Sequence, residues 1–223
     1  TVPRAPAAAP RARPVAPGTL PAQPAAAASS PEQQDEGELK AVRVLSELGR
    51  GVSLAFGQLL REAPYLSTLQ QGYCMSFDGG SRGNPGLAGA AAVLQDSQGR
   101  ELAVLQASLP FGCTNNEAEY AGLCMGLMGL QYLSAAGRVC RIVGDSQLVI
   151  RQVKGEYACR KPNLRPLHEE ATFLLGQLAV DSARVQHVLR NANARADELA
   201  NEAIDARPAP RIDCVYVCAR QGA

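Results

Sequence analysis

Hydrophobic and polar residues follow two different periods between residues 73 and 206. In five segments, apolar residues alternate with polar ones or form short apolar runs, a pattern that predicts strands. These segments are 73–78, 87–95, 101–109, 138–145 and 183–189. In four other segments apolar residues recur every three or four positions, which predicts helices. These segments are 114–137, 146–155, 163–178 and 193–206.

The predicted elements follow the order βββαβααβα. The turn "DSQGR" joins the second and third strands as a hairpin. Later strands alternate with helices, which favours parallel pairing. We therefore predict an α/β domain over residues 73–206, with a mixed five-stranded sheet flanked by helices.

The segments before and after this domain differ from it in composition. Residues 1–36 are rich in alanine and proline, which predicts disorder. Arginines and the lack of acids before Glu32 give this segment a weak likeness to an organelle transit peptide. Since the chain starts at Thr1 and serine is sparse, we favour a linker or a piece of a longer protein. The expected location is intracellular: nucleus, cytoplasm or an organelle.

Residues 37–70 are predicted to form an amphipathic helical extension of one or two helices. The apolar positions with helical spacing are Leu39, Val42, Leu45, Leu48, Val52, Phe56 and Leu59. Packing against the domain is the favoured interpretation, and binding of a protein partner by residues 37–66 is the alternative. For the tail, 207–223, a short strand in "RIDCVYVC" and disorder are both open.

Charge and cysteine content exclude several classes of protein. The chain of 223 residues has a net charge of +1, and residues 73–206 hold twelve Lys or Arg against fourteen Asp or Glu. Nucleic-acid binding would therefore need a local basic patch. The seven cysteines form no CxxC pair, so we expect buried, reduced thiols rather than a zinc site. No apolar run approaches the length of about 20 residues that spans a bilayer.

The stretch "FDGGSRGNPG", 77–86, allows three interpretations: a phosphate cradle, a hairpin turn or a support for Asp78. It lacks the Gly-Lys-Ser/Thr ending of a P-loop, and a strand-like segment follows where a dinucleotide fingerprint needs a helix. We predict that the first strand ends at Asp78 and that the glycines form the hairpin connection behind it.

Four carboxylates occupy positions that suit a metal site. Asp78 and Asp145 each end a predicted strand, and Glu119 and Asp197 each lie early in a predicted helix. Taken singly, each is explained as a turn, cap or helix-dipole residue. Together, converging carboxylates repel one another unless a cation joins them, and oxygen ligands favour Mg²⁺ or Mn²⁺ over zinc. Two such ions suit phosphodiester hydrolysis.

Four motifs occur in an order that resembles a known family. "DGGSRGNPG", "TNNEAEY", "VGDSQLV" and "NARADELANEA" are similar to the motifs of type 1 ribonuclease H, in the ribonuclease H-like superfamily. The resemblance covers about residues 73–206 and implies cleavage of the RNA strand of RNA–DNA hybrids. It also implies a monomer with two Mg²⁺ ions as cofactor, for which Mn²⁺ can substitute.

The resemblance implies roles for ten residues. It implies four metal ligands: Asp78, Glu119, Asp145 and Asp197. It implies contacts with the hybrid for five residues: Arg82, Asn84, Asn115, Asn116 and Gln147. Amide side chains suit the 2′-hydroxyls of the RNA minor groove, although the three asparagines also suit caps and turns. Glu117 falls at a variable position, so we expect a solvated helix residue there.

The chain departs from the family at two places. By count, His187 fills the position of the family's catalytic-loop histidine, but the strand pattern of 183–189 places it on the sheet. We therefore assign the role of the loop histidine to Arg190, which is the tenth residue with an implied role. The basic protrusion of larger members is reduced to a short segment, so the chain resembles the compact subgroup. This segment is either a phosphate-binding patch or a solvated loop, and its bases are Arg151, Lys154, Arg160, Lys161 and Arg165.

Three functions are compatible with these observations. The leading hypothesis is a magnesium-dependent endonuclease acting on RNA–DNA hybrids. A non-catalytic hybrid-binding module is the second, although all four acidic positions are filled. The third is the nuclease domain of a retroelement polyprotein, for which no polymerase-like sequence is present.

Overall fold

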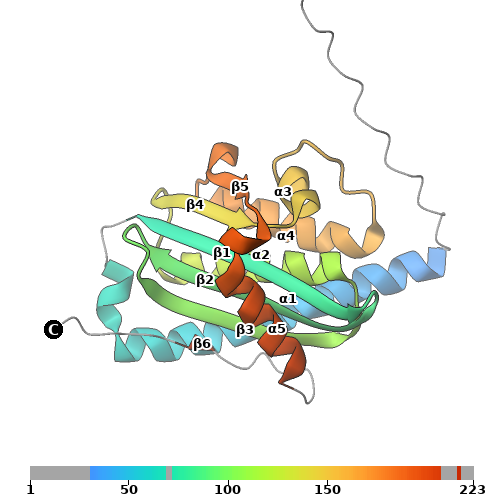
Figure 1. Cartoon of the computed structure of the whole chain (residues 1–223), viewed down its shortest axis with the longest axis horizontal. Coiled ribbons are helices and arrows are strands. Elements are labelled where there is room, and N and C mark those ends of the chain that lie inside the picture. Colours follow the sequence, from blue (N-terminus) through green and yellow to red (C-terminus); the bar gives the residue numbers. More distant parts are fainter. Residues whose placement is uncertain (1–30, 69–71, 207–214, 217–223) are drawn as a thin grey trace, which may run out of the picture.

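A mixed sheet forms the centre of the protein in the computed structural model, which describes residues 31–68, 72–206 and 215–216 (Figure 1). The described strands form one sheet in the order β5-β4-β1-β2-β3-β6. Their bounds are β1 Tyr73–Gly83, β2 Gly86–Asp96, β3 Glu101–Cys113, β4 Val139–Gly144, β5 Val185–His187 and β6 Val215–Tyr216. The predicted segments 1–30 and 217–223 lie outside the described residues.

Pairing in the sheet confirms the predicted topology. Strands β1, β2 and β3 form an antiparallel meander, and β4 joins the other side of β1 in parallel. Strand β5 pairs in parallel with β4. The two-residue β6 adds to the edge of β3 through Val104 and Leu105, so the tail contributes a short strand. The five predicted strands are thus present, and β6 is the sixth.

The predicted end of the first strand was wrong. β1 continues past Asp78 to Gly83, and every residue from Tyr73 to Gly83 has a partner on β2. The long β1–β2 ladder keeps the glycine-rich stretch extended, although glycine has low strand propensity. The turn itself is confined to residues 84–85.

Helices cover both faces of the sheet (Figure 1). Helix α5 crosses one face and contacts β1, β2 and β3, while α2 packs on the other face with α4 and α1 outside it. Their bounds are α1 Pro31–Glu62, α2 Asn115–Tyr132, α3 Gln147–Val153, α4 Arg165–Gln177 and α5 Ala194–Asp205. Short 3-10 helices are η1 Pro64–Thr68, η2 Pro162–Leu164, η3 Ser182–Arg184 and η4 Arg190–Ala192. The predicted order βββαβααβα is therefore confirmed over residues 73–206.

Helix α1 differs from the predicted extension in its start and in its buried face. It is one continuous helix that begins at Pro31, inside the segment predicted to be disordered. Its buried side chains lie three or four residues apart: Ala41, Val44, Leu48, Val52, Phe56 and Leu59. Leu39 and Val42, predicted on this face, are 72% and 53% exposed. Phe56 stacks on Tyr132 of α2 at 5.4 Å between ring centroids, so α1 packs on the domain.

The cysteines that the structure describes are free thiols. Cys113 and Cys124 are buried as predicted, whereas Cys74 and Cys159 are half-buried and Cys140 is exposed, so burial was predicted wrongly for these three. Cys214 and Cys218 lie outside the described residues. Within those residues, none of the helices combines the length and the apolar character that crossing a membrane requires.

Candidate active site

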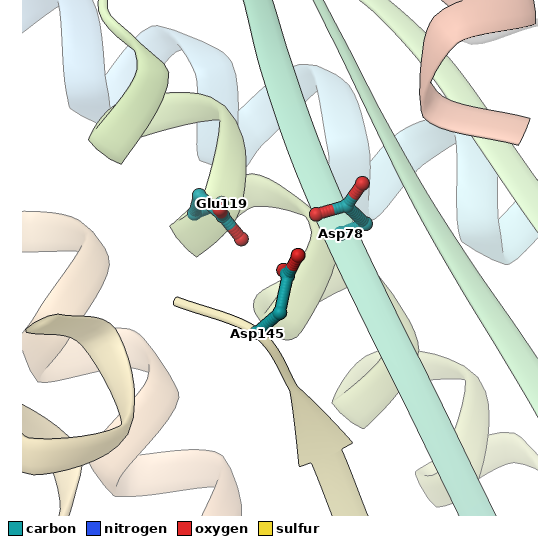
Figure 2. A group of neighbouring side chains, drawn as sticks. All are labelled: Asp78, Glu119 and Asp145. Carbon is teal, nitrogen blue, oxygen red and sulfur yellow. The ribbon is translucent and has the colours of Figure 1, made fainter. Parts of the chain in front are cut away.

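Three carboxylates from different elements point toward one another (Figure 2). Asp78 belongs to β1, Glu119 to α2, and Asp145 directly follows β4. One oxygen of each lies within 4.8 Å of the others. Asp78 and Glu119 are each only 5% exposed. Residues far apart in the sequence thus form one buried acidic cluster, which we call the acidic triad.

The parallel register between β1 and β4 brings two of these carboxylates together. Ser76 pairs with Val143. Asp78 lies two residues after Ser76 on β1, and Asp145 lies two residues after Val143, just beyond the end of β4. Strand β4 ends at Gly144, so the sheet opens beside Asp78. The carboxyl end of a strand is the usual place for a site in an α/β sheet. The prediction that the carboxylate lies at a strand end is correct for Asp145. Asp78 lies inside β1, but it reaches the same edge of the sheet because the neighbouring strand β4 ends at Gly144.

Two glycines bring Glu119 to the triad. A Cβ on Gly79 would lie 2.1 Å from the carbonyl carbon of Ala118, and one on Gly122 would lie 2.4 Å from the Asp78 carbonyl oxygen. Both distances are far below van der Waals contact, so only glycine lets the backbones of β1 and α2 come this close. Of the glycines after Asp78, Gly79 therefore serves helix packing. Gly83, with φ +91°, and Gly86, whose added Cβ would lie 2.1 Å from the Arg82 carbonyl oxygen, serve the hairpin turn.

Burial and mutual repulsion make the triad costly in its ionised form. Burial first, and then the charge and a hydrogen bond of Asp145, raise the pKa of Asp78 from 3.8 to about 8. Burial, followed by the charges of Asp78 and Asp145, likewise raises the pKa of Glu119 well above its ordinary value. At neutral pH Asp78 would hold a proton that a cation could replace.

The free oxygens of the triad fit a divalent cation. Oε2 of Glu119 and Oδ1 of Asp145 are buried and have no hydrogen-bond partner among the described residues. Buried carboxylate oxygens without donors are costly, and a cation satisfies them. An all-carboxylate donor set favours a hard cation such as Mg²⁺ or Mn²⁺. These residues therefore fit the divalent metal that the sequence predicted.

Asp197 and Arg190 form a pair beside the triad. Asp197 lies in the first turn of α5, outside the group of three, and its Oδ1 accepts a hydrogen bond from Nη2 of Arg190 at 2.5 Å. Arg190 opens η4, beyond β5, which confirms that it lies in a loop. His187 ends β5, and its Nε2 is 3.1 Å from the Asp145 carbonyl oxygen. Both side chains contact a predicted metal ligand, but Arg190 meets the carboxylate of Asp197, whereas His187 meets the backbone carbonyl of Asp145.

The residues predicted to contact nucleic acid are distributed around the triad. Asn84 and Asn115 are exposed and lie side by side, because the Asn84 side chain accepts a hydrogen bond from the Asn115 amide. Asn116 is half-buried beside them, and Gln147 is exposed at the start of α3. Arg82 instead forms an ion pair with Asp205 of α5, at 3.1 Å. Its role as a phosphate contact stays a prediction.

Two residues of the site region were missed or misjudged from the sequence. Asn193 is 2% exposed, and its Nδ2 donates to the carbonyl oxygen of Phe77, which fixes the start of α5 beside Asp78. Its only sequence signal was its place before a helix, which suggests a cap. Glu117, expected to be solvated, is 3% exposed and forms an ion pair with Lys40. A local pattern cannot reveal a partner that lies on another helix.

The short basic segment is partly neutralised. Arg151 and Lys154 both lie near Glu156, at 4.0 and 3.2 Å, and Arg165 lies 3.8 Å from Glu38 of α1. Arg160 and Lys161 are exposed. The two interpretations of this segment, a phosphate patch and a solvated loop, both stay open.

The fold and the triad define the class of the protein, a ribonuclease H-like domain with a buried acidic triad. A family model described as "Reverse transcriptase-like" matches residues 76–203. The chain belongs to this family, and its solved neighbours confirm the predicted likeness to type 1 ribonuclease H in its compact form.

Relatives of known structure cover the whole matched domain. The N-terminal RNase H domain of a Mycobacterium tuberculosis protein has 36% identity and a TM-score of 0.55, over 61% of this chain and 96% of that one. RNase H1 of Halobacterium salinarum has 35% identity and a TM-score of 0.53, over 60% and 98%. An RNase H1 solved in complex with an RNA/DNA hybrid has 34% identity and a TM-score of 0.53, over 60% and 97%.

Curated relatives extend beyond the matched domain. The mycobacterial protein, described as bifunctional, is 37% identical over 129 residues, which are 58% of this chain and 34% of that protein. Ribonuclease HI of Halobacterium salinarum is 40% identical over 130 residues, 58% of this chain and 62% of that protein. The chain thus spans about a third of the mycobacterial relative. Helix α1 lies outside the family match.

The raised pKa of Asp78 predicts how the stability of the metal-free protein depends on pH. Because the folded protein retains a proton that the unfolded chain loses above pH 3.8, stability should fall as pH rises from about 4 to about 8. Asp78→Asn removes this charge, so in chelator its melting temperature should exceed that of the wild type by at least about 2 °C at pH 8. Near pH 4 the wild type and Asp78→Asn should have the same melting temperature. An equal difference at both pH values would contradict the burial effect.

Proposed function

We propose that this domain hydrolyses the RNA strand of RNA–DNA hybrids, with two Mg²⁺ ions as cofactor. The observation that carries the proposal is the acidic triad, with its two buried oxygens that lack a hydrogen-bond partner among the described residues. A relative of 34% identity that was solved with an RNA/DNA hybrid supports the choice of substrate. The family match supports divalent-metal chemistry more generally.

Four carboxylates would hold the ions: Asp78, Glu119, Asp145 and Asp197. When bound, the ions lower the pKa of the attacking water and neutralise charge on the leaving oxygen. The chain itself supplies a rigid, buried support, because three separate elements fix the triad. The expected products carry a 5′-phosphate and a 3′-hydroxyl.

Selection of the RNA strand would depend on amide side chains near the triad. Asn84 and Asn115 are held next to each other, with Asn116 and Gln147 at two neighbouring helix starts. Amides both donate and accept hydrogen bonds, as do the 2′-hydroxyls that distinguish RNA from DNA in a wide minor groove. Arg190 would contact a phosphate near Asp197, since its exposed guanidinium lies beside that carboxylate.

The test of this function is cleavage of a labelled RNA–DNA hybrid, with duplex RNA and duplex DNA as comparison substrates. The wild type should cut only the RNA strand of the hybrid, and a chelator should abolish the cutting. Asp78→Asn should reduce turnover by about 100-fold or more, because even indirect supports of a metal cost up to that much. Asp35→Asn, an exposed aspartate of α1, is the matched control and should retain full activity. Hybrid binding without cutting, in Mg²⁺ and Mn²⁺ alike, would point to a binding module instead.

Alanine variants distinguish Arg190 from His187. Arg190→Ala should lower turnover by about tenfold or more, because it removes a positioned cation beside Asp197. His187→Ala should change turnover by less than about threefold, since the hydrogen-bond contact of its ring among the described residues is with a backbone carbonyl. Steady-state rates on the same hybrid decide between them. A large loss for His187→Ala with none for Arg190→Ala would reverse the assignment.

A further inference from the structure

Lys40 connects helix α1 to the beginning of α2. Its Nζ forms an ion pair with Oε1 of Glu117 at 2.7 Å and donates to the carbonyl oxygen of Gly112 at 2.9 Å. Gly112 lies near the end of β3 and Glu117 in the first turn of α2. A single side chain of α1 thus contacts both ends of the segment 112–117, which we call the entry turn of α2.

Glu117 links the ion pair with Lys40 to the hydrogen bonds at the start of α2. Its Oε2 accepts hydrogen bonds from the amide and the hydroxyl of Thr114, at 2.8 and 2.6 Å, and Thr114 in turn caps the Glu117 amide. This reciprocal arrangement is a capping box, which fixes the direction of the first turn. Asn115, the residue after Thr114, donates a hydrogen bond from its backbone amide to the side chain of Asn84. Two of the amide residues predicted to contact the hybrid, Asn115 and Asn116, therefore lie in the turn that Glu117 organises, and Asn84 is hydrogen-bonded to it.

The position of Lys40 is itself fixed by packing of α1. A Cβ on Gly37 would lie 3.1 Å from Cβ of Asn163, so α1 sits tightly against η2 one turn before Lys40. Val44, one turn after Lys40, is 4% exposed. Lys40 is 30% exposed at its side chain, whereas Glu117 is 3% exposed. A buried carboxylate needs a charged or hydrogen-bonding partner, and for one of its two oxygens that partner is on α1.

We infer that Lys40 is a positioning residue for hybrid binding, which acts through Glu117 on the entry turn of α2. The inference rests on the proposed function, since the readout is affinity for the hybrid. It assigns α1, which lies outside the family match, a part in the site as well as in the core. The effect falls on substrate binding rather than turnover, because the triad is held separately by the close packing at Gly79 and Gly122.

The experiment measures hybrid affinity of the full chain in an Asp78→Asn background, so that no cleavage occurs. Lys40→Met keeps the length of the side chain and removes its charge, and should raise Kd about tenfold. Glu117→Gln should raise Kd similarly, and the double variant no more than either single, because the two residues act as one unit. Lys40→Arg should restore most of the affinity. Arg43→Met, which breaks an exposed pair with Glu47 on the same helix, should change nothing.

Two further measurements separate positioning from other roles. Amide exchange in residues 113–118 should rise about tenfold in Lys40→Met and stay unchanged in α5. With Asp78 present, Lys40→Met should raise KM while kcat stays within about twofold. If Lys40 instead contacted phosphate directly, Glu117→Gln would free it and lower Kd, which would overturn the inference.

The outcomes distinguish this inference from the proposed function. A wild-type chain that does not cut the hybrid contradicts the proposed function. A chain that cuts the hybrid, with Lys40→Met and Arg43→Met alike in affinity, contradicts the inference alone. Faster exchange in the entry turn without a change in Kd would also overturn it.

Discussion

The cost of placing three carboxylates in one buried site is the constraint on which the rest of the structure depends. Asp78, Glu119 and Asp145 come within 4.8 Å, and burial with mutual repulsion raises the pKa values of Asp78 and Glu119. Apart from the hydrogen bond between Asp78 and Asp145, their own interactions would not bring them together. The elements that carry them must therefore be held by other contacts, and much of the fold serves that purpose.

Close packing of backbones supplies these contacts. Gly79 and Gly122 let β1 and α2 approach more closely than any side chain would permit, and Asn193 ties the start of α5 to β1. Helix α1 then covers α2 from outside, with Phe56 stacked on Tyr132 and Lys40 paired with Glu117. The triad is thus a strained arrangement supported from both faces of the sheet, which is a common property of functional sites.

Most of the fold and the main site residues were predictable from the sequence, because their signals are local. Strand and helix periods located the elements of residues 73–206, and carboxylates at strand ends and a helix start indicated the acidic triad. The extent of β1 was not predictable, because its glycine-rich half is kept extended by β2 rather than by its own propensity. The buried face of α1 was misjudged at Leu39 and Val42, which are exposed. Two neighbouring faces of the helix carry apolar residues at the same spacing, and only packing against the domain determines which face is buried. The pairing of Lys40 with Glu117 depends on tertiary contacts, which no local pattern encodes.

Calorimetric titration of the metal-free protein with Mg²⁺ at pH 7, in two buffers of different ionisation enthalpy, tests the central claim most directly. If the triad is the metal site, binding must release protons, because the pKa of Asp78 is about 8 before the cation arrives. The account predicts binding with a buffer-dependent enthalpy, and a smaller proton release in Asp78→Asn. The same enthalpy in both buffers, or equal binding by the two proteins, would contradict it.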